Sequence, residues 1–332
     1  MKRFIDLAEL THEQVQDLLA LAQRLEVRPE RQALAGKVLG LVFMNPSLRT
    51  LASFQSGMAQ LGGACFVITP GQGTWQLETR DGVVMNGAAA EHIREGLPVL
   101  ASYCDALGIR VFADGKDLAA DLAEKKFGAM AALVDRPLIN LESAVNHPCQ
   151  ALADWKTLDE LPGAARRKFV LSWVSHPKAL PLAVPAATVH MAAMRGMEVV
   201  VLRPDGFALP AAIMDKARSA AAASGGSVTE TADRAAALSG AHVIYAKEWG
   251  CTSHYGDDDA DKEMRRPLKD WCVRNDWFAQ AAADCRLMHC LPVRRNSAVA
   301  DEVLDGPRSL VLRQAYNRLP AQMAVLHRLL KA

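Results

Sequence analysis

Three short polar segments carry residues whose types and spacing could bind an anion. The first is Phe43-Met44-Asn45-Pro46-Ser47-Leu48-Arg49-Thr50, which follows an apolar run and opens a helical pattern. Free backbone N–H groups and the positive dipole end of a helix N-terminus favour phosphate. The Ser47 and Thr50 hydroxyls and the Arg49 guanidinium add donors there. From this segment alone, a helix cap at Ser47 with a solvated Arg49 explains the pattern equally well.

The second segment is Glu142-Ser143-Ala144-Val145-Asn146-His147-Pro148-Cys149-Gln150. His147 and Gln150 flank Pro148 at the start of a helical pattern, where one imidazole and one amide could hydrogen-bond a polar carbonyl. Taken alone, the segment favours a capping His147 with an exposed Gln150. Glu142 is either a surface carboxylate or the partner of an ammonium group.

The third segment is His289-Cys290-Leu291-Pro292-Val293-Arg294-Arg295-Asn296, again after a short apolar run. A zinc site is disfavoured, because adjacent residues of an extended chain point to opposite faces and no partner ligands stand at suitable spacing. Arg294 and Arg295 supply either an anion contact or an interdomain ion pair. Arg110, at the end of another apolar run, is a fourth cationic group in an equivalent place.

Apolar runs rich in Val, Ile and Leu alternate with segments of helical period, which predicts an α/β fold with parallel strands covered on both faces. The expected strands are Lys37–Phe43, Ala64–Ile68, Ala106–Val111, Pro137–Asn140, Phe169–Trp173, Glu198–Leu202, Ala241–Tyr245 and Leu287–His289. The expected helices are Leu48–Leu61, Glu91–Cys104, Leu118–Gly128, Pro148–Glu160, Pro181–Arg195, Pro210–Ser224, Asp233–Ser239 and Ala315–Leu330. Ligands of open α/β sheets bind outside the carboxyl ends of the strands, so the polar strand ends predict one phosphate-bearing ligand between two domains.

The length of 332 residues predicts two domains, with a boundary near the helix that begins at Pro148. A fresh series of strands and helices starts after Leu161-Pro162-Gly163, and the last helix is expected to dock on the first domain. Gly71–Gly73 and Gly250–Lys262 are expected to be mobile loops.

Composition excludes several classes. The net charge of +1 argues against a general nucleic-acid or membrane-surface binder, which needs a basic excess. The N-terminus resembles no signal peptide, and no apolar stretch reaches the ~18 residues of a membrane span, so a cytoplasmic protein is expected. The seven cysteines form no C-x-x-C pair, which disfavours a disulfide scaffold. Neither G-x-x-x-x-G-K-[ST] nor G-x-G-x-x-G is present, so the two familiar nucleotide folds have no support.

In this order and spacing, the three segments resemble the S-T-R-T, H-P-x-Q and H-C-L-P motifs of the aspartate/ornithine carbamoyltransferase family. They stand here as Ser47–Thr50, His147–Gln150 and His289–Pro292. The resemblance implies two doubly wound α/β domains with parallel sheets, joined by interdomain helices. Residues 1–147, with the C-terminal helix 314–332 packing back on them, would bind carbamoyl phosphate, and residues 148–313 would bind the acceptor.

The acceptor is indicated by departures from the ordinary ornithine enzymes. Their Ser-Met-Gly loop is replaced by Tyr245-Ala246-Lys247-Glu248-Trp249-Gly250. The Asn45–Thr50 segment, Trp75 and Glu91-His92-Ile93 are similar to the N-acylornithine branch. That branch carbamoylates N-acetyl- or N-succinylornithine in arginine biosynthesis.

Three positions favour the succinyl substrate. Acetyl-type enzymes typically have Glu before the Glu-His-Ile triplet, where this chain has Ala90. A carboxylate there would repel the succinyl carboxylate. Acetyl-type enzymes also carry a carboxylated Lys where this chain has Ala298, and the segment His176–Pro185 is similar to the succinyl-type loop. Leu51 departs from the branch, which usually has Arg at that position.

The mechanism implied by the resemblance is attack of the acceptor's δ-amine on the carbonyl of carbamoyl phosphate, with phosphate leaving. Arg49, Arg110, His147, Gln150 and Cys290 would be catalytic, with Arg49, Arg110 and His147 near the carbonyl oxygen. The residues implied to bind carbamoyl phosphate are Ser47, Leu48, Arg49, Thr50, Trp75, Arg110, His147, Pro148, Cys149, Gln150, Cys290, Leu291, Arg294 and Arg318. Those implied to bind the N-acylornithine are Ala90, Glu142, His176 and Lys247.

No metal or organic cofactor is needed for this reaction. The family also implies a homotrimer in which the loop of Trp75 reaches a neighbouring subunit's site. Two other interpretations stay open: a non-catalytic homologue that binds carbamoyl phosphate as a regulator, and carbamoyl transfer to another amine such as putrescine or aspartate.

Overall fold

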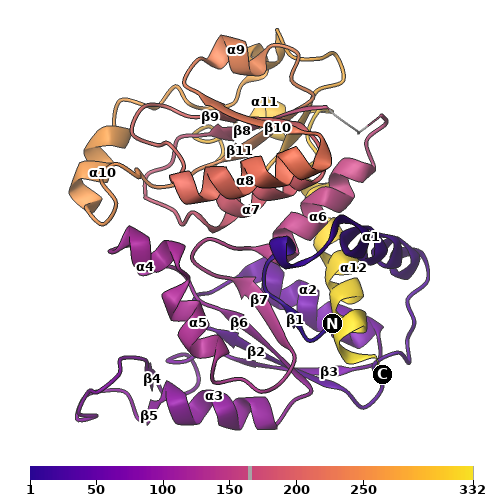
Figure 1. Ribbon diagram of the computed structural model, residues 1–332, viewed down its shortest axis with the longest axis vertical. Helices are drawn as coiled ribbons and strands as arrows, with labels where there is room; N and C mark the ends of the chain where they lie inside the picture. The colour runs from indigo at the N-terminus through magenta and orange to yellow at the C-terminus, as the bar shows by residue number, and fades with distance from the viewer. Residues whose placement is uncertain (164–166, 332) are drawn as a thin grey trace. The chain divides into compact units, whose positions relative to one another are not determined.

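The computed structural model describes residues 1–163 and 167–331 and divides the chain into two compact units (Figure 1). Unit 1 consists of Met1–Ala113, Ala123–Cys149 and Arg318–Ala332, and unit 2 of Asp114–Leu122 and Gln150–Asn317. Each unit has a five-stranded parallel sheet, so the predicted α/β class with parallel sheets is confirmed.

The sheet of unit 1 has the strand order β1-β7-β6-β2-β3. Its strands are β1 (Arg3–Phe4), β2 (Val38–Phe43), β3 (Ala64–Ile68), β6 (Ala106–Arg110) and β7 (Leu138–Glu142). Its helices are α1 (His12–Val27), α2 (Leu48–Gln60), α3 (Ile93–Ser102) and α5 (Lys125–Ala131), and the short strands β4 (Leu77–Glu78) and β5 (Glu91–His92) pair with each other.

The central strands of unit 1 are continuous apolar runs because helices cover both faces of the sheet. Every residue of β6 and β7 is buried. Two glycines allow the close approach of neighbouring strands: a Cβ added at Gly40 would lie 2.7 Å from Leu107 and Phe66, and one at Gly108 would lie 2.9 Å from Leu41.

The sheet of unit 2 has the strand order β10-β9-β8-β11-β12. Its strands are β8 (Lys168–Trp173), β9 (Glu198–Leu202), β10 (Ser227–Thr231), β11 (Val243–Lys247) and β12 (Arg286–Met288). Its helices are α4 (Leu118–Leu122), α7 (Ala183–Met194), α8 (Ala211–Ser224), α9 (Arg234–Leu238), α10 (Asp258–Arg265) and α11 (Asp301–Leu304). The division between the units falls inside α6 (Pro148–Asp159) and α12 (Val311–Leu330).

The structure corrects the sequence prediction at several elements. The helices α1 and α11 and the strands β1, β4, β5 and β10 were not predicted, and β5 takes the first two residues of the helix expected over Glu91–Cys104. The strand β10 is an edge strand in which only Val228 is apolar, so it lacks an apolar run. The predicted helix Leu118–Gly128 is broken into α4 and α5, because Glu124 has a left-handed backbone with φ of 53°. The expected loop Gly250–Lys262 ends in the helix α10, which is capped by Asp257.

Candidate active site

Polar groups of unit 1 gather at the carboxyl edge of its sheet. The strands β7, β6 and β2 are neighbours, and parallel strands end at the same edge. Arg110 is the last residue of β6, Glu142 the last of β7, and Ser47 follows β2 by four residues.

The N-terminus of α2 is built as the sequence predicts. Ser47 is its N-cap, with an extended backbone and a side chain that accepts a hydrogen bond from Thr50 N at 3.3 Å. The helix cap expected at Ser47 is confirmed. The Leu48 side chain is 79% exposed, so only its backbone N–H is available to a ligand at the helix end.

Arg318 of α12 reaches the same helix. Its Nη2 donates a hydrogen bond of 2.7 Å to Thr50 Oγ1, and both side chains are buried. Two of the residues expected to bind carbamoyl phosphate, far apart in sequence, are thus in direct contact.

Arg110, Glu142 and His147 form a buried cluster beside this helix end. Arg110 Nη1 donates to Glu142 Oε2, and His147 Nε2 lies 3.4 Å from the same oxygen. The Arg110 guanidinium also stacks 4.5 Å from the centre of the Phe112 ring. Because Glu142 and Gln150 are both buried, the interpretations of a surface Glu142 and an exposed Gln150 are wrong.

The electrostatics of this cluster favour an anionic ligand. Burial, and then the positive charges of Arg318, Arg110 and Arg49, lower the pKa of His147 well below its usual value, so the imidazole is neutral at pH 7. Burial also lowers the pKa of Arg318, and Arg110 and Arg49 act in the same direction. Arg318 and His147 thus lie where positive charge is already present, and a phosphate group there would favour the charged form of Arg318.

The loop that carries His147 is held by Glu124. Its carboxylate accepts hydrogen bonds from Ser143 Oγ at 2.7 Å, Ala144 N at 3.1 Å and Val145 N at 3.0 Å. The left-handed backbone of Glu124 therefore has a positional role between β7 and α6. Glu124 was not predicted as a functional residue, because no local sequence pattern links it to a loop about 20 residues away.

In unit 2, Gln150 belongs to a buried network around Asp154. Gln150 Nε2 and Gln314 Nε2 donate to Asp154 Oδ1 at 2.8 and 2.7 Å, and Tyr245 OH donates to Asp154 Oδ2 at 2.8 Å. The network fixes the orientation of the Gln150 amide. Asp154 was not singled out from the sequence.

Lys247 and the His289–Pro292 segment are linked by Glu248. The buried Glu248 carboxylate lies 3.5 Å from Lys247 Nζ and 3.3 Å from His289 Nε2. His289 Nδ1 accepts a hydrogen bond of 2.9 Å from Leu291 N. Leu291 has a left-handed backbone conformation with φ of 59°. The Leu291–Pro292 peptide bond is cis. One carboxylate therefore holds together two segments whose paired residues, Glu248 and His289, lie 41 positions apart in sequence.

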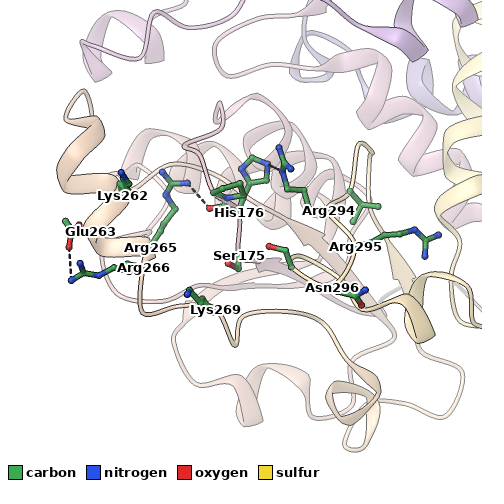
Figure 2. Close-up of a pocket in the computed structure, with 13 residues that line it drawn as sticks. Ser175, His176, Lys262, Glu263, Arg265, Arg266, Lys269, Arg294, Arg295 and Asn296 are labelled. Atoms are coloured by element: carbon green, nitrogen blue, oxygen red, sulfur yellow. Dashed lines mark hydrogen bonds and ion pairs between the residues drawn. The ribbon is translucent and has the colours of Figure 1, made fainter.

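His176 lies in a pocket of about 850 Å³ in unit 2 (Figure 2). Arg294 Nε lies 3.0 Å from His176 Nε2, and His176 Nδ1 lies 2.9 Å from Lys178 O. When the His176 proton is on Nδ1, Nδ1 donates a hydrogen bond to the Lys178 carbonyl oxygen, and Nε2 accepts one from Arg294 Nε. Burial lowers the pKa of His176, which agrees with this neutral form.

The predicted site residues fall in both units. Unit 1 contains Ser47, Leu48, Arg49, Thr50, Trp75, Ala90, Arg110, Glu142, His147, Pro148, Cys149 and Arg318, and unit 2 contains Gln150, His176, Lys247, Cys290, Leu291 and Arg294. Trp75 is 61% exposed in its loop, where its Nε1 donates to Glu91 Oε2 at 2.8 Å. Among residues 1–163 and 167–331, no group of three His, Cys, Asp or Glu side chains is arranged to hold a metal. In the same ranges, no helix is both long and apolar enough to cross a membrane.

Comparisons with known proteins cover nearly the whole chain. Residues 2–160 match the carbamoyl-P binding domain of aspartate/ornithine carbamoyltransferase, and residues 184–329 match its Asp/Orn binding domain. The chain is 35% identical over 330 residues to the N-acetylornithine carbamoyltransferase of Xanthomonas campestris pv. campestris, covering 98% of this chain and 97% of the relative. It is 34% identical over 316 residues to the N-succinylornithine carbamoyltransferase of Bacteroides thetaiotaomicron, covering 94% of each.

Two solved structures of transcarbamylases are also similar to this chain over almost its whole length. A crystal structure of acetylornithine transcarbamylase complexed with acetylcitrulline superimposes with a TM-score of 0.95 at 35% identity, covering 100% of both chains. A variant of N-acetyl-L-ornithine transcarbamylase with one Glu replaced by Ala, complexed with carbamyl phosphate and N-succinyl-L-norvaline, gives a TM-score of 0.94 at 35% identity, covering 99% of this chain and 100% of that one.

Proposed function

The chain belongs to the aspartate/ornithine carbamoyltransferase family, in its N-acylornithine branch, and on that premise we propose that it transfers the carbamoyl group of carbamoyl phosphate to the δ-amine of N-succinyl-L-ornithine. The products are N-succinyl-L-citrulline and phosphate. The δ-nitrogen forms the new C–N bond, the C–O bond to phosphate breaks, and the departing phosphate takes the proton of the amine.

In this proposal residues 1–147 and the C-terminal helix bind carbamoyl phosphate, and residues 148–313 bind most of the acceptor. Ser47, the Leu48 N–H, Arg49, Thr50 and Arg318 hold the phosphate group. This assignment is supported by the buried Arg318–Thr50 contact and by the positive charges of Arg110 and Arg49, which act against the charge of Arg318. Trp75, Pro148, Cys149 and Arg294 complete the proposed carbamoyl phosphate contacts.

The carbamoyl group is oriented in the proposal by Arg110, His147, Gln150 and the backbone of Cys290 and Leu291. Arg110 and His147 are held by Glu142, and the Gln150 amide by Asp154, so each donor is fixed before the ligand arrives. Preorganised donors that meet developing negative charge each contribute ~3 kcal/mol to lowering the barrier.

The proposal that the acyl group is succinyl rests on Ala90. Acetyl-type enzymes typically carry a carboxylate at this position, and Ala90 has none. A solved relative that has lost one Glu is complexed with an N-succinyl ligand, which is consistent with that reasoning. N-acetyl-L-ornithine is the alternative acceptor, favoured by the identity of 35% to an acetyl enzyme against 34% to a succinyl enzyme. Glu142, His176 and Lys247 would contact either acceptor.

We also propose a cytoplasmic homotrimer in which Trp75 reaches the site of a neighbouring subunit. The exposure of Trp75 in a loop supports a partner surface there. Sedimentation equilibrium would test the trimer, and a monomeric active enzyme would contradict it.

The experiment that tests the acceptor measures ureido product from carbamoyl phosphate with N-succinyl-, N-acetyl- and free L-ornithine in parallel. We expect the highest kcat/KM with N-succinyl-L-ornithine. A higher value with N-acetyl-L-ornithine would overturn the acyl assignment, and a folded protein inactive with all three would overturn the proposed function.

A further inference from the structure

The pocket around His176 is strongly cationic. It lies among the His176–Pro177 segment, the helix α10 with the residues after it, and the Val293–Ser297 segment (Figure 2). Six of its lining side chains are basic and one is acidic, Glu263; the basic ones are Lys262, Arg265, Arg266, Lys269, Arg294 and Arg295.

Half of this charge is already neutralised within the protein. Arg265 pairs with Asp261, Arg266 Nη2 lies 2.8 Å from Glu263, and Arg295 lies 2.7 Å from both Asp301 and Asp305. Lys262, Lys269 and Arg294 have no carboxylate partner among the residues that the structure describes. The pocket therefore presents an excess of positive charge to a ligand.

The helix α10 is fixed to the segments that carry the proposed acceptor contacts. Arg265 is buried, and its Nη1 donates a hydrogen bond of 2.8 Å to His176 O. Asp261 Oδ1 accepts a hydrogen bond of 2.6 Å from Cys251 N, four residues after Lys247. Lys262 lies on this anchored helix and Lys269 four residues beyond its end, so both ammonium groups are brought to the pocket that contains His176.

We propose that this pocket, through Lys262 and Lys269, binds the terminal carboxylate of the acceptor's acyl chain. N-succinylornithine carries one more negative charge than N-acetylornithine, and a longer acyl chain. A cationic surface of mobile, solvated ammonium groups attracts that additional carboxylate and has no equivalent partner in an acetyl group. The inference rests on the proposed function, and it adds Lys262 and Lys269 to Ala90 as residues that select the acyl group.

The test is the double variant Lys262→Gln/Lys269→Gln, whose positions are exposed and contribute no buried packing. We expect the ratio of kcat/KM for N-succinyl- over N-acetyl-L-ornithine to fall about tenfold, mainly through the KM of the succinyl substrate. The variant Lys262→Arg/Lys269→Arg keeps the charges and should retain the ratio within about twofold. The variant Lys216→Gln/Arg218→Gln, on the exposed side of α8, controls for the same loss of net charge.

Binding without turnover separates the two proposals. N-succinyl-L-norvaline and N-acetyl-L-norvaline lack the δ-amine, so calorimetry in the presence of carbamoyl phosphate reports binding alone. If the wild type prefers the succinyl acceptor but Lys262→Gln/Lys269→Gln leaves both the kinetic ratio and the succinyl-norvaline Kd unchanged, the pocket assignment is wrong and the function stands. If the wild type turns over only the acetyl substrate, the proposed function is wrong, and a lysine-dependent Kd for succinyl-norvaline would still support the pocket.

Discussion

Arg318 donates a hydrogen bond to the hydroxyl of Thr50 across 268 residues of sequence, so the last helix of the chain completes the N-terminus of α2. The contact places a buried guanidinium beside the N-terminus of α2, and a guanidinium and a helix N-terminus both favour an anion. Burial, with Arg110 and Arg49, lowers the pKa of Arg318, so a bound anion would favour its charged form.

Replacement of Arg318 should therefore weaken carbamoyl phosphate binding. A hydrogen bond to a charged group contributes about 1.5–3 kcal/mol, so Arg318→Gln should raise the KM for carbamoyl phosphate roughly 10- to 100-fold. The matched control is Arg313→Gln on the same helix, where the side chain is paired with Glu160. Equal effects of the two substitutions on this KM would show that Arg318 has no specific role.

His147 should make the stability of the protein depend on pH. Its pKa is lowered in the folded state, so below its unfolded pKa of about 6.5 only the unfolded chain gains the proton. Stability then falls as the pH falls from 7 to 5, by up to ~1.4 kcal/mol per pH unit from this group. His147→Gln should flatten that slope in urea unfolding at pH 5, 6 and 7.

The exposed His12 provides the control for this measurement, because it lies on the surface of α1. His12→Gln should leave the slope as it is in the wild type. A slope of the wild-type size in His147→Gln would mean that the neutral, buried imidazole does not contribute to the pH dependence.

Glu248 should contribute both to the stability of the fold and to binding of the acceptor. Burial alone would raise its pKa, but Lys247 and His289 hold the pKa well below its usual range. Its contribution is thus present above the unfolded pKa of about 4.3 and is lost as the pH falls through the folded value. At pH 7, Glu248→Gln should lower the free energy of unfolding by about 3 kcal/mol, since it leaves a buried Lys247 without its carboxylate.

The same variant should raise the KM for the N-acylornithine more than that for carbamoyl phosphate, because Lys247 loses its fixed position. Glu263→Gln removes an exposed ion pair and should cost less than about 1 kcal/mol. If Glu248→Gln changed stability but neither KM, the carboxylate would serve the fold alone.

Local signals predicted much of the fold and only part of the site. The cap at Ser47 and the apolar runs of β2 and β6 are determined by neighbouring residues, so the sequence pattern predicted them within one or two positions. The strand β10 was missed because an edge strand needs no apolar run. Its place depends on β9, whose own apolar pattern was predicted.

The residues that hold the site in place carry no recognisable signal in the sequence. Glu124 binds a loop that the fold brings to it, and Asp154 and Glu248 each join a sequence neighbour to a distant group. Nothing in their own neighbourhood marks them as different from surface carboxylates. Arg318 was named only through the family resemblance, since its contact with Thr50 is created by the packing of α12. Motifs thus indicate which groups touch a ligand, whereas the structure shows what positions those groups.

The acyl preference should respond to a single charge at position 90. Ala90 is exposed and immediately precedes Glu91, whose carboxylate accepts the hydrogen bond from Trp75 and whose strand pairs with Leu77–Glu78. The loop around Ala90 is thus held by β5, and a new carboxylate there would add one negative charge near a proposed acyl group. At an effective dielectric constant of about 20, two carboxylates at contact distance repel by up to ~4 kcal/mol.

Ala90→Glu should therefore lower the ratio of kcat/KM for N-succinyl- over N-acetyl-L-ornithine by tenfold or more. The control variant Ala90→Gln has a side chain of the same size as Glu but no charge, and it should change the ratio much less. Steady-state kinetics with both acceptors at saturating carbamoyl phosphate would measure this. Because repulsion between charges is screened by salt, the effect of Ala90→Glu should shrink at high ionic strength. An unchanged ratio in Ala90→Glu would remove Ala90 from the acyl site, and an equal shift in both variants would assign the effect to size instead of charge.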